Sequence, residues 1–315
     1  MTLVSLPRGQ TERWLSSMRR ALAAAAVMSA LVAPMLGPNA VNAQAPIPLN
    51  SRVKLDYAAT TKFSALRERL QQRGILEQYS QFLSPLRLKR GYTVTTVDCG
   101  RVNADYNNDG KDNRRIRLCY EYLAMVENEA AVPREQLPSP LRNTPGVGLM
   151  QGFTRAEVII GGIIQVLLHE TGHAIFDIQG IPRLGREEDA ADGISGLMML
   201  QFGQSVALTT IKGAINVFHH MDSKFKFDPH DMADVHSLDI QRLYNYLCLA
   251  YGSEHSAALQ TLADTYLPAV RKPNCAIEYQ QALRAFEKTV LPDVDRPLLE
   301  RVRQMPILRP EDLKL

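Results

Sequence analysis

The sequence predicts an α+β domain in which a small antiparallel sheet lies over two long helices and a helical C-terminal part follows. Three observations carry this prediction. Two segments of alternating, β-branched residues, 92–98 and 115–120, lie close together in the first half of the chain. An almost unbroken apolar run at 158–178 is long enough for a buried helix. Helical patterns then continue from residue 186 to residue 305.

The composition is that of an ordinary globular chain of 315 residues, with 45% hydrophobic residues and a net charge of +3. This length suffices for one large domain or two small ones. The excess positive charge lies wholly in the first 43 residues, which carry four arginines and one glutamate. The remainder is neutral, so the global charge gives no reason to expect a nucleic acid or an anionic membrane as partner.

Residues 1–43 are predicted to be a secretory signal peptide, and residues 44–315 the mature domain. A basic segment ends at Arg20, an apolar, alanine-rich stretch follows, and Val41-Asn42-Ala43 offers small residues for cleavage. Pro34 breaks the short apolar stretch, so an uncleaved membrane anchor fits less well. The pair of arginines leaves twin-arginine export open. Either route predicts a periplasmic or secreted protein.

The four cysteines all lie beyond the predicted cleavage site, at Cys99, Cys119, Cys248 and Cys275. An even number in an exported chain indicates disulfides, and four cysteines allow three pairings. We favour Cys99–Cys119 and Cys248–Cys275, because each pair lies within one local unit of the chain. A metal site is the alternative, but no C-x-x-C spacing supports it.

The two alternating segments are predicted to pair as a β-hairpin, while residues 53–75 are expected to be partly helical. The stretch from Asp105 to Gly110 lies between the segments and is rich in turn residues. It also resembles the first half of a calcium loop, with Asp105, Asn107 and Asp109. Ile116 stands where such a loop needs a bidentate glutamate, so a turn is the better interpretation.

The apolar run carries the motif His169-Glu170-Thr171-Gly172-His173, which has the form H-E-x-x-H. Residues four apart lie on one face of a helix, so His169 and His173 can present two imidazoles to one ion. Glu170 would stand beside that ion, where a carboxylate can take a proton from metal-bound water. Two histidines and a glutamate in a buried helix need partners, and a metal supplies them.

The limits of this helix are also marked in the sequence. Thr154 and Glu157 form the pattern of a capping box, and Gly180-Ile181-Pro182 is a stop signal. A membrane-spanning helix is a poor alternative, because two glycines and a glutamine between residues 161 and 165 interrupt the apolar run.

A third ligand is predicted on the next helix, where Glu188 and Asp192 lie four residues apart on one face. Glu188 would complete a His, His, Glu site with an open fourth position for water, as in catalytic zinc sites. Asp192 could accept the free ring N–H of His169 and fix its tautomer. Attraction to the helix dipole explains Glu187 and Glu188 but not Asp192. We therefore expect one zinc ion per chain.

Another pair of histidines, His219 and His220, closes the predicted helix 204–222. Adjacent residues cannot face one ion from one face of a helix. Both side chains are therefore expected at the surface.

The motif pair, H-E-x-x-H followed by E-x-x-x-D on the next helix, resembles the glutamate zincins, of which thermolysin is the type; the linker is shorter here. The wider sequence is similar to a bacterial family described only as "putative metallopeptidase", of unknown function. Its patterns C-G-x-x-N-A-aromatic-Y and I-x-L-C-Y-E correspond to Cys99–Tyr106 and Ile116–Glu121, with Asp105 in place of the aromatic. Its patterns D-x-H-S-L-x-x-Q-R and C-x-x-E-Y correspond to Asp234–Arg242 and Cys275–Tyr279.

The resemblance implies a zincin-like fold in which the sheet covers two zinc-binding helices. It implies that Asn103 and Ala104 lie on an edge strand and bind substrate by strand addition. An ordinary edge strand is the alternative. It also implies that His236, oriented by Asp234 or Asp231, donates a hydrogen bond to the oxyanion of the tetrahedral intermediate. The alternative for Asp234 is a cap of the predicted helix 237–250.

Together these features predict an exported zinc metallopeptidase in which Glu170 is the general base and a peptide or protein is the substrate. No membrane-spanning segment is expected after signal cleavage, and no nucleic-acid partner. Two alternatives stay open. One is an envelope binding module that holds zinc without turnover, and the other is an amidase that acts on cell-wall peptides.

Overall fold

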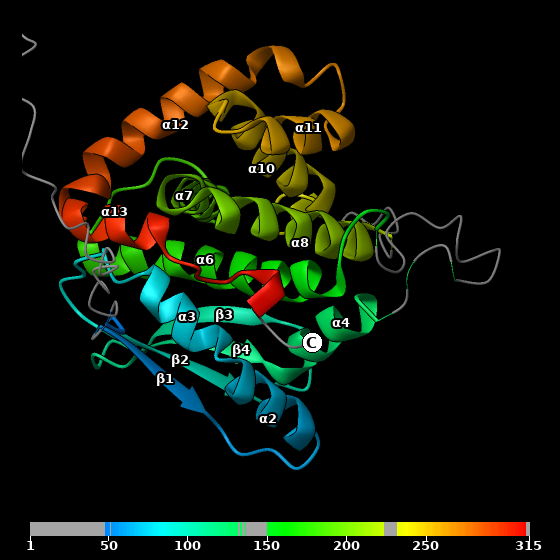
Figure 1. The fold of residues 1–315 in the computed structure, drawn as a ribbon. Coiled ribbons are helices and arrows are strands. Elements are labelled where there is room, and N and C mark those ends of the chain that lie inside the picture. The colour runs from blue at the N-terminus through cyan, green and yellow to red at the C-terminus, as the bar shows by residue number, and fades with distance from the viewer. Residues whose placement is uncertain are drawn as a thin grey trace, which may run out of the picture. The chain divides into compact units, whose positions relative to one another are not determined.

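The computed structural model describes residues 48–312 apart from residues 51, 132, 134–135, 137–149 and 224–231. The predicted signal peptide and Asp231 lie outside the described residues. The described part is an α+β domain with a helical C-terminal part, as predicted. Figure 1 shows the long helix α6 (Arg155–Gln179) between the sheet and a second group of helices.

The sheet has four strands in the order β1-β2-β4-β3. Their bounds are Val53–Tyr57 for β1, Tyr92–Val97 for β2, Ala104–Asn108 for β3 and Arg114–Cys119 for β4. Strands β1 and β4 both run parallel to β2, and only β3 runs antiparallel to its neighbour β4. The predicted antiparallel sheet is therefore wrong in detail, because the sheet is mixed.

The predicted hairpin is also wrong in its partners. The segment 104–108, which was expected to be a turn, is itself the edge strand β3 and forms the hairpin with β4. Alternation and β-branched content predict a strand but not its direction. The β3 sequence Ala-Asp-Tyr-Asn-Asn is turn-like by propensity, so its backbone pairing with β4 decides its conformation. Strand β1, at the start of the segment expected to be partly helical, was not predicted.

Three helices lie close to the sheet in the first half of the domain. They are α2 (Ser64–Arg73), α3 (Ile75–Phe82) and α4 (Tyr120–Glu129). Gly74 separates α2 from α3 with a φ of 61°, a left-handed conformation that glycine adopts without strain. The crossover from β1 to its parallel neighbour β2 runs through these two helices, as parallel pairing requires.

Helix α6 begins and ends where the sequence predicts. Thr154 and Glu157 make both hydrogen bonds of the capping box, and Gly180 ends the helix in a left-handed conformation. By length and composition α6 could cross a membrane, but 89% of its most apolar window is buried within the domain. It is the only helix in the described part that passes that test, and its burial identifies it as a core helix.

Two further helices, α7 (Glu187–Phe202) and α8 (Gln204–Asp222), pack against α6. Close approach to α7 depends on Gly172, since a Cβ atom there would lie 2.9 Å from Ala191 Cα and 3.0 Å from Ala191 O. Gly161 permits the same approach to α8, where its Cβ would lie 2.1 Å from Thr209 O. The expectation that His220 lies at the surface is wrong. This residue is buried in α8, and its Nδ1 lies 2.8 Å from Oε2 of Glu129 at the end of α4.

The predicted helical C-terminal part is confirmed. It comprises α10 (Asp239–Ser253), α11 (Ala257–Tyr266), α12 (Cys275–Thr289) and α13 (Arg296–Gln304), with short 3-10 helices at Lys272–Asn274, Leu291–Asp293 and Pro310–Asp312. Both favoured disulfides are present. Cys99 pairs with Cys119 at the end of β4, and Cys248 of α10 pairs with Cys275 of α12.

We predict that Gly172→Ala will lower the free energy of unfolding by about 1–3 kcal/mol, because the added methyl group must push α7 away from α6. Urea denaturation measures this change. The matched control is Gly193→Ala on α7, where a Cβ atom meets nothing within 4 Å. The control should be neutral or should raise stability by up to about 1 kcal/mol. Equal stability of both variants would refute the proposed close packing.

Candidate metal centre and substrate cleft

Helices α6 and α7 bring three ligand atoms together. The Nε2 atoms of His169 and His173 are 3.3 Å apart, and each lies 3.1 Å from Oε2 of Glu188. A tetrahedral ion with bonds of about 2.0–2.1 Å places its ligand atoms about 3.3–3.4 Å apart. Two imidazole nitrogens and one carboxylate oxygen in this triangle therefore fit a single metal ion in donor type and in spacing.

The other nitrogen of each ring faces a carboxylate. His169 Nδ1 lies 2.7 Å from Asp192 Oδ1, and His173 Nδ1 lies 2.9 Å from Glu187 Oε1. When each Nδ1 carries the proton and donates it, each Nε2 presents a lone pair to the ion. The contact of Asp192 was expected. The contact of Glu187, which also forms an ion pair with Arg183 at 2.9 Å, was not expected.

The carboxylates of this cluster are stabilised by positive charge. Burial alone would raise the pKa of Glu188, but the surrounding histidines outweigh this effect and lower it. Burial lowers the pKa of His173, yet hydrogen bonds to Glu188 and Glu187 outweigh it and raise the pKa to about 9. Protons on the imidazoles thus take the place in which a divalent cation would compensate the carboxylates.

Asp192 is in turn held by helix α10. Arg242 donates to both of its oxygens, from Nε at 2.8 Å and Nη2 at 3.0 Å, and the Tyr246 hydroxyl donates at 3.0 Å. Burial alone would raise the pKa of Asp192, but Arg242 and His169 outweigh it and keep the carboxylate ionised. The sequence interpretation missed Arg242 and Tyr246, whose spacing of four residues on one helix face was the available signal.

Glu170 lies beside the three ligand atoms and is not one of them. It is 5% exposed, and the backbone of Tyr106 on β3 lies close enough to lower the pKa of its carboxylate. Burial raises the pKa of Glu170. A buried carboxylate with a raised pKa beside the candidate metal centre has the properties of a general base.

Strand β3 is an edge strand of the sheet, and its residues line a cavity beside Glu170. The Cys119 N–H donates to Asn103 O, and antiparallel pairs alternate, so residues 105 and 107 also face β4. The backbone groups of Ala104 and Tyr106 therefore point away from β4, toward the cleft. Asn103, which was expected on the edge strand, directly precedes it, and its side-chain amide donates to Asp105 at 3.4 Å.

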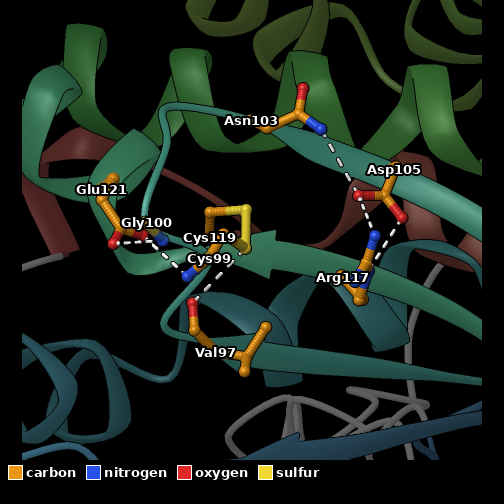
Figure 2. Close-up of a disulfide and its surroundings, with 8 residues drawn as sticks. All are labelled: Val97, Cys99, Gly100, Asn103, Asp105, Arg117, Cys119 and Glu121. Carbon is orange, nitrogen blue, oxygen red and sulfur yellow. Dashed lines mark hydrogen bonds and ion pairs between the residues drawn. A yellow bond between two sulfur atoms is a disulfide. The ribbon is translucent and has the colours of Figure 1, made fainter.

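Both ends of β3 are anchored. Figure 2 shows the Cys99–Cys119 disulfide beside Glu121, whose carboxylate accepts the backbone N–H groups of Cys99 and Gly100 at 3.1 and 2.9 Å. It also shows Asp105, which replaces the aromatic residue of the family pattern, in a two-bond ion pair with Arg117 on β4.

At the far end of β3, Asp177 of α6 accepts hydrogen bonds from the Tyr106 hydroxyl at 2.7 Å, Asn108 Nδ2 at 3.0 Å and Arg114 Nε at 2.7 Å. These contacts fix the edge strand against the helix that carries the histidines. Asp109 lies in the turn after β3 and accepts from the Lys111 backbone and from Asn113.

Two cavities, of about 420 Å³ and about 690 Å³, lie along β3. We call them the smaller and the larger cavity. Both are lined by Asn103, Ala104, Glu170, Asp234 and His236. They therefore form two parts of one cleft that passes Glu170, with His169 in the wall of the smaller cavity and His173 and Glu188 in the wall of the larger.

His236 reaches the candidate metal centre from the segment before α10. Its Nε2 lies 3.0 Å from Glu188 Oε2, and its Nδ1 lies 2.9 Å from Asp234 Oδ1. Hydrogen bonding to Glu188, followed by that to Asp234, raises its pKa against burial. Asp234 also accepts the backbone N–H of His236 at 2.8 Å. Asp234 therefore orients His236 and does not cap α10, which has Leu238 at its N-cap.

A family model described as "Putative metallopeptidase" matches residues 56–290, most of the chain. The chain belongs to this family. It is accordingly a hydrolase of the metallopeptidase type, for which a metal and a peptide substrate are implied. No curated protein and no solved structure matches the chain. The matched range contains every residue of the candidate site, so family and geometry concern the same part of the molecule.

We predict that Glu187→Ala will weaken metal binding by about tenfold to a hundredfold, because His173 loses the carboxylate that fixes its tautomer. Titration against a competing chelator measures the dissociation constant. Asp189→Ala is the matched control, since it removes an acidic residue from the same helical turn but contacts Ser237 rather than a histidine. Equal affinities of the two variants would show that the contact between Glu187 and His173 is unimportant.

Proposed function

We propose that this protein is an exported zinc metallopeptidase with one zinc ion bound by His169, His173 and Glu188. The triangle of ligand atoms, with edges of 3.1–3.3 Å, is the observation that carries the proposal. Two histidines and one carboxylate are a ligand set of catalytic zinc sites, in which a fourth position stays open. When bound, zinc lowers the pKa of a coordinated water to about 7 and polarises the carbonyl of the substrate.

The remaining steps are assigned to side chains of the chain. Glu170 takes a proton from the attacking water and delivers it to the leaving amine. His236, held by Asp234, donates a hydrogen bond to the oxyanion that forms at the carbonyl. The ring Nε2 of His236 already faces the metal side of the cleft, 3.0 Å from Glu188.

A peptide is proposed to bind in extended form along β3. The outward-facing N–H and C=O groups of Ala104 pair with its backbone, and Asn103 lines the same stretch of the cleft. A peptide bound in this proposed way would have a peptide bond next to Glu170, which lines both cavities. A binding module without turnover is disfavoured, because open cavities adjoin Glu170 where such a module would be filled by its own side chains.

Export is proposed on two grounds. The two disulfides indicate folding in an oxidising compartment outside the cytoplasm. Residues 1–43 have the composition of a cleaved signal peptide, which leaves residues 44–315 as the mature peptidase domain in the periplasm or outside the cell.

We predict that Glu170→Gln will lower the rate of peptide hydrolysis by about a hundredfold to ten-thousandfold while zinc content stays at one ion per chain. A mixed library of quenched fluorescent peptides gives the rate, and elemental analysis gives the zinc. The control is Glu287→Gln on the exposed face of α12, which should keep the wild-type rate. Wild-type turnover in Glu170→Gln would contradict the assignment of the base.

A further inference from the structure

The smaller cavity has a wall of mixed character beside Glu170. Its apolar lining includes Val166, Val217, Phe218, Met221 and Leu238. Two carboxylates complete the wall, Asp222 at the end of α8 and Asp239 at the start of α10. A volume of about 420 Å³ lies within the range of ligand pockets. The cavity therefore has the size and position to receive a substrate side chain next to the bond that is cut.

Within the described part of the chain, neither Asp222 nor Asp239 has a hydrogen-bond or ion-pair partner, although the charges of Arg242 and His236 act on Asp239. Burial raises the pKa of Asp239, and the charge of Asp222 adds to this effect against the opposing charge of Arg242. A cation that binds between these two carboxylates would stabilise both of their negative charges.

Arg242 cannot serve as that cation. It is the one lysine or arginine among the described residues that line the smaller cavity. It makes two hydrogen bonds to Asp192, and its guanidinium lies 5.1 Å from the centre of the Phe218 ring. Its charge is thus compensated by Asp192, which supports His169, and the charges of Asp222 and Asp239 remain.

The lining of the larger cavity also carries more acidic than basic side chains. Arg186 is its only lysine or arginine among the described residues, whereas Glu187, Glu188, Asp234 and Glu170 all line it. A divalent ion at the candidate metal centre would compensate two of these charges. The excess of carboxylates along the cleft contrasts with the neutral chain beyond residue 43, so the negative charge is local to the candidate substrate path.

We propose that the smaller cavity binds a lysine or arginine side chain, so that the enzyme cleaves peptides beside basic residues. The methylene stem of such a side chain covers the apolar wall, while its cationic head lies between Asp222 and Asp239. An apolar side chain would leave both carboxylates desolvated and unpaired, and an acidic one would be repelled. The inference rests on the proposed peptidase function and adds its substrate class.

The test compares quenched peptides that differ at single positions around the cut, with lysine, norleucine or glutamate. Wild type should cleave the lysine peptide with a kcat/KM about tenfold to a hundredfold above that of the norleucine peptide, and the glutamate peptide should be slowest. Asp239→Asn and Asp222→Asn should each reduce the ratio of lysine to norleucine cleavage by about tenfold or more. The norleucine rate should rise, because each variant removes one carboxylate that an apolar side chain would leave desolvated and unpaired.

Asp264→Asn is the matched control. It removes the same charge from α11, outside both cavities, and should keep the wild-type preference. Equal cleavage of all three peptides by wild type, or an unchanged ratio in both cavity variants, would overturn the inference while leaving the peptidase function intact.

Absence of any cleavage would count against the peptidase function, and binding then tests the cavity by itself. Fluorescence anisotropy of labelled peptides with zinc-loaded Glu170→Gln protein measures affinity without turnover. Tighter binding of the lysine peptide, lost in Asp239→Asn, supports the inference. Equal affinity for the lysine and glutamate peptides refutes it.

Discussion

The candidate ligands come from two helices, and their spacing depends on how closely α7 packs against α6. Gly172 lies inside the H-E-x-x-H motif and leaves room for the backbone of Ala191. This contact sets Glu188, at the start of α7, 3.1 Å from both imidazoles of α6. Gly172 therefore has a packing role within the motif, since a side chain there would separate the two helices.

Elements outside the motif hold the ligands and the substrate edge in place. Helix α10 supplies Arg242 and Tyr246 to Asp192, which orients His169, and a disulfide joins α10 to α12. On the other side, Asp177 of α6 binds Tyr106 and Asn108 of β3, so the edge strand is held against the helix that carries the histidines. A buried network in which each polar group has a partner keeps such a site rigid.

The sequence predicts those features of the fold and of the candidate site that depend on residues close together in the chain. The capping box, the glycine stop, and the i,i+4 spacing of His169 and His173 depend only on helix geometry. The direction of β2 and the edge strand β3 could not be predicted, because strand pairing is set by distant partners. The sequence also did not predict the contacts of Glu187 and Arg242 or the burial of His220. Each of these depends on a contact between two different helices. The assignment of ligands and base remains a prediction for experiment.

The most direct test of the account is the metal content of the purified mature protein, with wild type beside Glu188→Ala. Elemental analysis should find about one zinc per chain in wild type and a loss of most of it in the variant, because a catalytic zinc site needs three protein ligands. The protein should be analysed as isolated and again after reconstitution with zinc. Wild-type protein without zinc after reconstitution, or full zinc content in Glu188→Ala, would contradict the proposed His, His, Glu site.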